Sequence, residues 1–223
     1  MTYFEPTLPS RASRHIPMRT KGSVRGAFVI QLDKPRSVVF ESRLELMTAL
    51  ILLSKEHVVD LIDQPPPISY TDVDGKIRSH TPDYMVVFAN GKRVVVAVKP
   101  LAAVERLNFR QTLGLIKAQM GDYADDLILV TDQSFTRAEA ENAELLHEVR
   151  AEVDEEADDQ LLRLIASLNS SCSIGQLIAA SGLGGRAFRS IARLIAKHRC
   201  RLVGNDRISY RSMVEPTHRQ TAN

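Results

Sequence analysis

An aspartate and a lysine occupy positions from which they could act together on one substrate. Asp83 stands in Thr81-Pro82-Asp83-Tyr84, where a strand is expected to begin, and Lys99 ends the following expected strand. The intervening Asn90-Gly91 is typical of a type I′ hairpin turn, so both side chains can lie at the same end of a sheet. Carboxylates hold hard divalent cations, and a nearby lysine can stabilise charge that develops on an attacked group.

Glu45 is the second carboxylate of this candidate site. It lies in residues 41–54, where apolar residues form two stripes of an expected helix, and it stands between Leu44 and Leu46. A buried charge without a partner is costly. A divalent metal shared with Asp83 would supply that partner.

These residues have the outline of the PD-(D/E)xK nucleases. In that plan two carboxylates and a backbone carbonyl, here that of Val98, hold Mg²⁺ or Mn²⁺, while the lysine orients or activates the attacking water. The bare motif is weak evidence, because Asp and Lys are common at strand ends. It predicts an α/β fold with a restriction-endonuclease-like core, a mixed sheet flanked by helices.

The surrounding sequence resembles the TnsA-like transposon endonucleases over about residues 35–135. The resemblance is carried, in order, by Glu41-Ser-Arg-Leu-Glu45, His57-Val-Val-Asp-Leu61, Gln64-Pro65, Ile68-Ser-Tyr70, Thr81-Pro-Asp-Tyr84, Val94 to Pro100 and Leu129-Val-Thr-Asp132. It implies an endonuclease subunit that nicks the 5′ ends of a transposon during cut-and-paste transposition. It also implies double-stranded DNA, a DDE-type transposase and an ATP-dependent AAA+ regulator as partners.

Carried over by position, the resemblance implies that Glu45 is the helix carboxylate, Asp83 the metal-holding aspartate and Lys99 the catalytic lysine. Gln64 matches a characteristic glutamine of the family, which we expect to be structural or to face DNA. His80 precedes the Pro-Asp motif and is a candidate contact for phosphate or water, although a polar strand residue is the commoner role.

The chain departs from the family at Ala97, two residues before the lysine, where Glu or sometimes Gln is usual. Alanine can neither bind a metal nor accept a proton. Three explanations remain open: an introduced mutation, natural loss of activity with DNA binding or assembly retained, or replacement by another carboxylate such as Glu41 or Asp72. Ala97 favours one alternative function, a catalytically dead nuclease-fold DNA-binding or assembly factor. A separate alternative is a phage or mobile-element nuclease with the same fold and no transposase partner.

Periodicity predicts the elements that must position these residues. Strands are expected near residues 28–40, 57–62, 67–71, 81–89, 93–100 and 127–131, and helices at 41–54 and 102–119. The strand–helix–strand order from residue 93 to residue 131 predicts a parallel pairing.

The C-terminal part predicts a winged helix-turn-helix. Helices are expected at 158–169, 174–180 and 186–198, followed by a hairpin of residues 201–204 and 207–211, and Ser173 with Gln176 fits a capping box. Cations recur on one face of the third helix, as in a recognition helix. The candidate DNA-binding residues are Arg186, Arg189, Arg193, Lys197 and Arg207, with docking onto a protein as the alternative role.

Charge and composition complete the expectations. Residues 160–223 carry ten Lys/Arg against two Asp/Glu, and residues 136–159 carry two against ten. We expect a basic arm over residues 1–34 containing Arg11, Arg14, Arg19, Lys21 and Arg25, an endonuclease-like domain over 35–155, a winged helix over 156–214 and a disordered tail over 215–223. The 44% hydrophobic and 25% charged residues exclude a fully disordered chain, two cysteines exclude a disulfide scaffold, and apolar runs are too short to span a bilayer. The sequence thus predicts a cytoplasmic protein of bacterial or mobile-element origin, without membrane contact.

Overall fold

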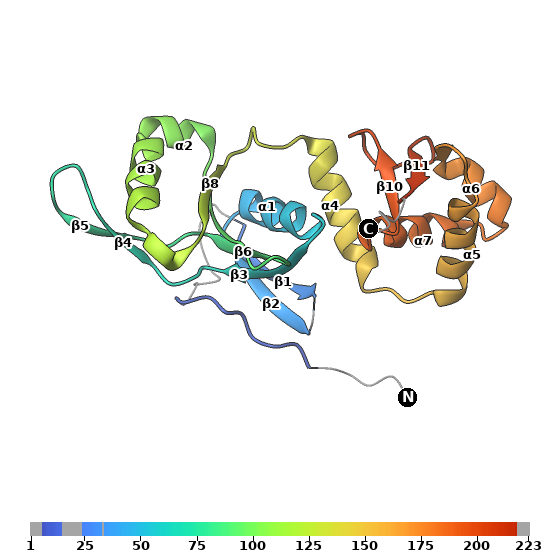
Figure 1. Ribbon diagram of the computed structural model, residues 1–223, viewed down its shortest axis with the longest axis horizontal. Coiled ribbons are helices and arrows are strands. Elements are labelled where there is room, and N and C mark those ends of the chain that lie inside the picture. The colour runs from blue at the N-terminus through green and yellow to red at the C-terminus, as the bar shows by residue number, and fades with distance from the viewer. Residues whose placement is uncertain (1–5, 15–23, 33, 218–223) are drawn as a thin grey trace. The chain divides into compact units, whose positions relative to one another are not determined.

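The computed structural model describes residues 6–14, 24–32 and 34–217 and has a mixed α/β fold. The chain divides into two compact units, residues 1–135 and 136–223 (Figure 1). The division falls earlier than the boundary expected near residue 155. The reason is that helix α4 (Arg137–Arg150) belongs to the second unit, where its Val149 packs against Ala192 and Ala196.

The N-terminal unit is built on a four-stranded mixed sheet in the order β3-β6-β7-β8, and β7 and β8 pair in parallel as expected. A separate ribbon joins β1 to β2, and a second hairpin joins β4 to β5. The elements are β1 (Gly26–Gln31), β2 (Pro35–Phe40), α1 (Arg43–Leu53), β3 (Val58–Asp63), β4 (Ile68–Thr71), β5 (Ile77–His80), β6 (Tyr84–Phe88), β7 (Arg93–Val98), α2 (Leu101–Arg106), α3 (Phe109–Gln119), the short 3-10 helix η1 (Gly121–Tyr123) and β8 (Asp126–Val130).

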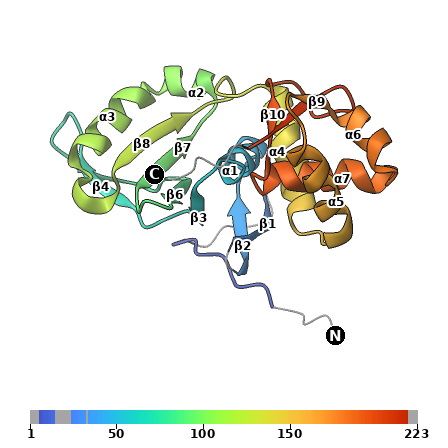
Figure 2. The same ribbon diagram turned by 45° about the vertical axis from the view of Figure 1, so that its right-hand side comes forward.

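Helices cover both faces of this sheet, as Figures 1 and 2 show for α1 and α3. On one face, Ala49 and Leu53 of α1 pack with Tyr84 and Val96 of the sheet. On the other face, α3 contributes two buried residues to a cluster with Met85, Val95 and Ala97, namely Leu113 and Ile116. Successive strand residues point to opposite faces of the sheet. Because both faces are covered by helices, β7 is almost continuously apolar.

Three local features differ from the sequence-based expectation. Gly91 has a φ of +83°, whereas Asn90 is not among the described residues with positive φ, so the turn is not type I′. A hydrogen bond from Gly91 N to Phe88 O instead closes a turn that ends in a glycine bulge. The helix expected over 102–119 is broken at Asn108, whose φ is +47°. The β4–β5 hairpin, which projects from the sheet in Figure 1, was not expected as a pair.

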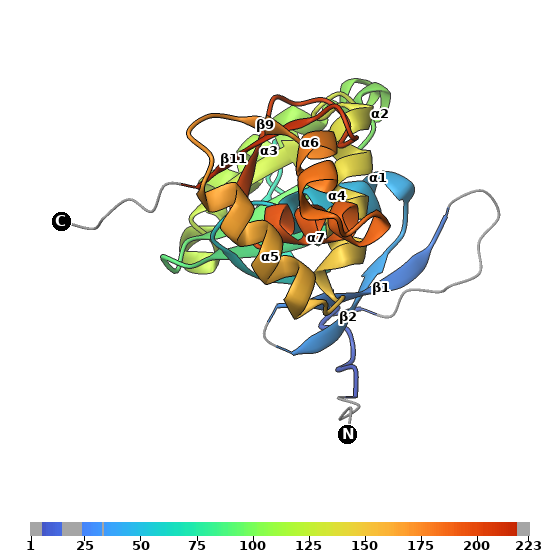
Figure 3. The ribbon, with the colours of Figure 1, turned by 90° about the vertical axis from the view of Figure 1, so that its right-hand side faces the viewer.

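The C-terminal unit packs four helices with a three-stranded sheet in the order β10-β11-β9. Figure 3 shows the helices α4 to α7 of this unit. Besides α4, its elements are α5 (Glu155–Ala166), β9 (Cys172–Ser173), α6 (Ile174–Ser181), α7 (Gly185–Ala196), β10 (Cys200–Val203) and β11 (Met213–Pro216). Its core joins Leu161, Ile174, Ile191 and Val214.

The capping box at Ser173 and Gln176 is confirmed, because each side chain bonds the other residue's backbone N–H. The last strand was placed wrongly at 207–211: residues Arg207 to Ser212 form a turn held by Ser209 and Ser212, and the strand follows it. Part of the expected tail therefore lies in β11.

The expected basic arm is not a separate region. Leu8 forms a bridge with Arg36 of β2, and β1 falls within residues 1–34. Arg19 and Lys21 of the expected arm, and residues 218–223 of the expected tail, lie outside the described residues. No helix in the described part of the chain is long and apolar enough to cross a membrane.

Candidate functional site

Asp83 lies where β6 begins, beside the end of β7. Its backbone N–H donates to the Val96 carbonyl at 3.0 Å, and its carboxylate accepts from Val98 N at 2.6 Å. Lys99 follows directly, with its N–H bonded to the Val130 carbonyl of β8 at 3.0 Å. The hairpin therefore brings Asp83 and Lys99 to the same end of the sheet, as the sequence predicts.

Glu45 comes from the first turn of α1 and is 8% exposed. Its carboxylate accepts from Glu41 N at 2.7 Å and from the Ser42 hydroxyl at 2.9 Å, while Glu45 N donates to the same hydroxyl at 3.1 Å. Ser42 is the N-cap of the helix. Glu45 therefore also has a capping role that the Ser-x-x-Glu spacing could have revealed.

The pKa of Asp83 is shifted by both of the other candidate residues. Burial, and then the negative charge of Glu45, raise the pKa of Asp83 to about 7, while the Val98 N–H and the charge of Lys99 oppose this rise. Burial likewise raises the pKa of Glu45. One buried and one half-buried carboxylate that cannot easily ionise together form a site that a cation would stabilise.

Tyr84 adds a polar group to this sheet end that the sequence analysis did not single out. The residue is 1% exposed, and its hydroxyl has no hydrogen-bond partner among the described residues. Burial and the charges of Glu45, Asp83 and Asp63 raise its pKa well above the usual value. An unpartnered buried hydroxyl beside two carboxylates fits a position where a ligand or water is bound.

His80 and Phe109 lie around the lysine. The Lys99 ammonium is 4.8 Å from the centre of the Phe109 ring, and the His80 ring meets Phe109 edge-on at 5.6 Å. Burial, and then the charge of Lys99, lower the pKa of His80, whose Nε2 has no partner among the described residues. The structure thus places His80 next to the site and favours its neutral form.

Gln64 and Glu41 also lie at this sheet end. Gln64 follows β3, is 2% exposed, and donates its N–H to the Asp83 carbonyl at 2.9 Å. Its side-chain oxygen accepts from Arg14 Nε at 2.8 Å. Glu41 is paired with Arg14 and with Arg25, so its carboxylate is already neutralised by two cations. Asp72, the other carboxylate considered for Ala97, instead lies in the β4–β5 turn and binds Arg78.

The donor set suits a hard cation but is small. Glu45, Asp83 and the Val98 carbonyl are oxygen donors of the kind that Mg²⁺ and Mn²⁺ prefer. Among the described residues there is no group of three or more His, Cys, Asp or Glu that could hold a metal ion. Ala97 is 1% exposed and packs in the apolar cluster beneath α3, so it leaves the site without a third carboxylate.

The cations of α7 are paired within the C-terminal unit. Arg186 binds Asp154 at 2.7 Å and Glu156 at 2.9 Å. Arg189 binds Glu152 and, at 2.8 Å, Glu148.

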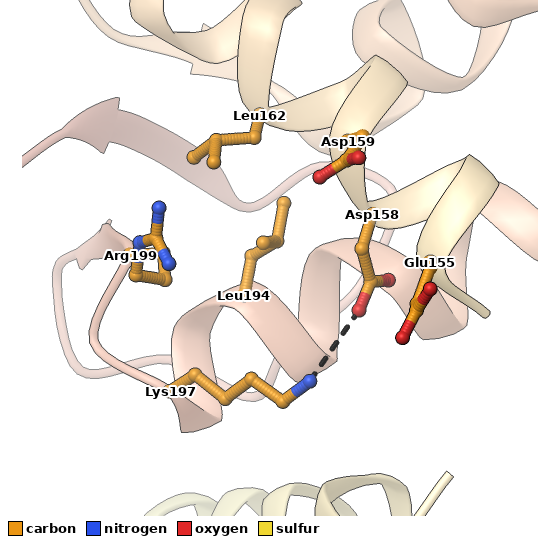
Figure 4. Close-up of a pocket in the computed structure, with 7 residues that line it drawn as sticks. All are labelled: Glu155, Asp158, Asp159, Leu162, Leu194, Lys197 and Arg199. Carbon is orange, nitrogen blue, oxygen red and sulfur yellow. Dashed lines mark ion pairs between the residues drawn. The ribbon is translucent and has the colours of Figure 1, made fainter. Parts of the chain in front are cut away.

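The remaining two cations of α7 meet at one carboxylate. Arg193 binds Asp158 at 2.7 Å. Lys197 approaches the same carboxylate at 3.5 Å, and Figure 4 marks this second pair. This ion pair borders a pocket whose lining contains both acidic and basic side chains, among them Glu155, Asp159 and Arg199. The charges around the pocket are therefore mixed and give no single-signed surface.

This pairing corrects the predicted recognition face. Arg193 is 2% exposed and cannot face DNA as expected, because its guanidinium is buried against Asp158 and Ser190. Arg186, Arg189 and Lys197 remain partly exposed, but carboxylates occupy them. Arg207 is 72% exposed and lies 3.1 Å from Glu141. The acidic residues 136–159 supply these carboxylates.

No protein-family model matches this sequence, and no curated protein matches it.

Proposed function

We propose that the N-terminal unit is a metal-dependent DNA endonuclease domain with a restriction-endonuclease-like core. The observation that carries the proposal is the placement of Asp83 and Lys99 at one end of the sheet, where the Asp83 carboxylate accepts from Val98 N and the charge of Glu45 raises the pKa of Asp83. The residue types, their order and the hairpin that joins two of them correspond to the PD-(D/E)xK plan. The wider sequence resemblance favours a TnsA-like subunit that nicks the 5′ ends of a transposon.

The site residues would divide the chemistry among them. Glu45, Asp83 and the Val98 carbonyl would hold Mg²⁺ or Mn²⁺, which supplies Lewis-acid stabilisation and a more acidic water when bound. The Lys99 ammonium, at the same sheet end as Asp83, would orient the attacking water and donate to a phosphate oxygen that gains charge. Phe109 would keep that ammonium in place through its ring face.

The partners follow from the same resemblance. Transposon-end DNA, a DDE-type transposase and an AAA+ regulator are the proposed partners, and the related alternative is a phage or mobile-element nuclease without a transposase. The helices and the small sheet of the C-terminal unit support a winged-helix-like domain. Because carboxylates occupy the cations of α7, we favour protein docking over DNA contact for that helix.

Ala97 favours a second candidate, a catalytically dead DNA-binding or assembly factor. The residue is buried in an apolar cluster with Met85 and Leu113, so the local packing suits alanine. Retention of Glu45, Asp83 and Lys99 disfavours this candidate, because loss of activity would be expected to erode them as well.

The variant Ala97→Glu distinguishes the two candidates. The added carboxylate supplies an oxygen ligand beside Asp83, which holds the metal more firmly and positions it better. We expect metal-dependent nicking at least about 100-fold faster than that of the chain with Ala97, since a misplaced cation removes transition-state stabilisation worth several kcal/mol. The assay is nicking of end-labelled transposon-end DNA with Mg²⁺ or Mn²⁺ and the transposase present.

Two double variants are the controls: Ala97→Glu with Lys99→Ala, and Ala97→Glu with Asp83→Asn, both of which should be inactive. Rapid nicking by the Ala97 chain would mean that another group already completes the site. Absence of nicking by the Ala97→Glu variant, with partners and metal supplied, would support the non-catalytic candidate.

A further inference from the structure

The described part of the N-terminal segment is bound to the edge of the candidate site. Asp63, which is fully buried, accepts hydrogen bonds from the Ser10 hydroxyl at 2.5 Å and from Arg11 N at 3.2 Å. Ser13 N then donates to the Gln64 carbonyl at 2.9 Å. Residues 10–13 therefore follow the end of β3, next to the strand that carries Asp83, and bring Arg14 to a defined place.

Gln64 links Arg14 to the site. It adopts a φ of +41°, which is unusual for a residue other than glycine, and it is almost completely buried. Its backbone N–H binds the Asp83 carbonyl, and its side-chain oxygen binds Arg14 Nε at 2.8 Å. A strained, buried polar residue that orients one guanidinium indicates that the position of this guanidinium matters.

Positive charge is in excess around the single carboxylate of Glu41. Glu41 is paired with Arg25 at 3.2 Å as well as with Arg14. Burial raises the pKa of Glu45, and the charge of Arg14 opposes that rise, so Arg14 acts at the candidate metal site. Its side chain is 45% exposed, and Gln64 and Glu41 engage one nitrogen each, so part of the planar fork faces solvent.

We propose that Arg14 binds a backbone phosphate of the DNA close to the strand to be cut, and that Gln64 is the positioning residue that orients it. A phosphate approaching Glu45 and Asp83 is repelled by their charge, and an arginine fork at the site edge offsets that repulsion while fixing the register of the strand. This inference rests on the proposed function in one respect, that the substrate is DNA.

The test compares Arg14 with Arg11, a matched residue of the same segment. Arg11 is 52% exposed and binds Asp60 at 2.7 Å. It therefore forms an arginine–carboxylate pair of similar exposure that does not include the bond between Arg14 and Gln64. The measurement is the affinity of the full chain for a short DNA duplex as a function of salt, in Ca²⁺ to suppress cleavage.

We expect Arg14→Gln to reduce the slope of log K against log salt by about 0.9, the value for one lost phosphate contact, whereas Arg11→Gln leaves it nearly unchanged. Gln64→Leu should reproduce the Arg14→Gln effect, because the guanidinium loses its orientation. Arg14→Lys should restore most of the slope but not the full affinity, since lysine lacks the planar fork. Thermal unfolding of each variant reports whether the fold is intact.

Equal slopes for Arg14→Gln and Arg11→Gln in folded proteins would overturn the inference and leave the nuclease proposal standing. A lower melting temperature for Arg14→Gln with an unchanged slope would also overturn it and would make the contact purely structural. If the parent chain binds no duplex at any salt concentration, the proposed function fails, and the role of Arg14 fails with it.

Discussion

The end of the four-stranded sheet and helix α7 both concentrate charged side chains, but they balance those charges in opposite ways. At the sheet end, Glu45 is buried and Asp83 half-buried, and the charge of Glu45 makes ionisation of Asp83 harder. On α7, every one of the four predicted DNA-binding cations faces at least one carboxylate. Burial opposes ionisation of Asp158, but Arg193 outweighs it together with Ser190 and Lys197, so the pKa of Asp158 is lowered, whereas that of Asp83 is raised.

This difference separates a candidate ligand site from a structural network. Paired buried charges stabilise a packing arrangement without needing anything from solution. Unbalanced buried charges cost stability, and such a cost is common where a ligand or reaction supplies the missing charge. The sheet end is therefore the better candidate for a ligand site than α7, although the cations of α7 are the more conspicuous feature of the sequence.

The largest expected effect is the loss of the buried ion pair of α7. Arg193→Met leaves Asp158, which is 13% exposed, without its main partner. Breaking a buried pair from one side costs about 3–5 kcal/mol, so we expect the C-terminal unit to lose most of its stability. Hydrogen exchange of the α7 amides measures the local free energy of opening.

The control for that variant is Arg137→Gln. Arg137 is 91% exposed and forms an i,i+4 pair with Glu141, which is worth only about 0.3–0.5 kcal/mol. Similar destabilisation by the two substitutions would show that the α7 network is as loosely held as a surface pair, and the contrast with the sheet end would lose its basis.

The next effect in size is the pH dependence created by Asp83. Its pKa is about 7 in the folded chain against 3.8 for the free side chain, so between these values the folded protein keeps a proton that the unfolded chain has lost. The free energy of unfolding therefore falls as pH rises from about 4 to 7 and stays low above that range. Each tenfold change in proton affinity corresponds to about 1.4 kcal/mol, which gives an upper limit of about 4 kcal/mol.

Asp83→Asn should flatten this dependence and stabilise the protein at pH 8 in EDTA, because the amide can still accept from Val98 N without carrying a charge. Urea unfolding at pH 5 and pH 8 measures the difference. Asp72→Asn is the control: Arg78 lowers the pKa of Asp72, so this carboxyl is ionised in both states above pH 5 and the slope should not change. The opposite result would be a parent protein that is more stable at pH 8 than at pH 5, with Asp83→Asn removing that gain. It would contradict the claim that burial and the charge of Glu45 oppose ionisation of Asp83.

The sequence predicted best those features that depend on neighbouring residues. The Asp83–Lys99 hairpin, the parallel pairing of β7 with β8 and the capping box at Ser173 follow from local periodicity and turn chemistry, and the structure has all three. The turn at Asn90 was predicted in the wrong class because one glycine with positive φ satisfies it.

Features that depend on long-range contacts were missed or misread. Arg14 lies 50 residues from Gln64 and 27 from Glu41 in the chain, so no spacing rule connects them. The helical periodicity of α7 correctly aligned its cations, but it carried no information on the carboxylates between Glu148 and Asp158 that face them. Periodicity gives the direction of a side chain, and the elements packed opposite decide whether that direction is open.

The smallest expected effect concerns the exposed cations of α7. In the double variant Arg186→Gln with Arg189→Gln, the lost pairs are partly exposed and should cost at most about 1 kcal/mol each. A helix that gripped DNA with both arginines would lose about 1.8 from the slope of log K against log salt. We expect almost no change, because Glu148, Glu152 and Glu156 hold these guanidinium groups and repel phosphate.

A complementary double variant removes the carboxylates instead of the arginines. Glu152→Gln with Glu156→Gln removes carboxylates that occupy Arg189 and Arg186, so it should strengthen DNA binding and steepen the slope if the carboxylates are what masks the arginines. A slope reduced by nearly 1.8 in the arginine variant would mean that DNA displaces the acidic residues. In that case α7 is a masked DNA-binding surface rather than a structural network, and balanced charge would no longer distinguish the two regions.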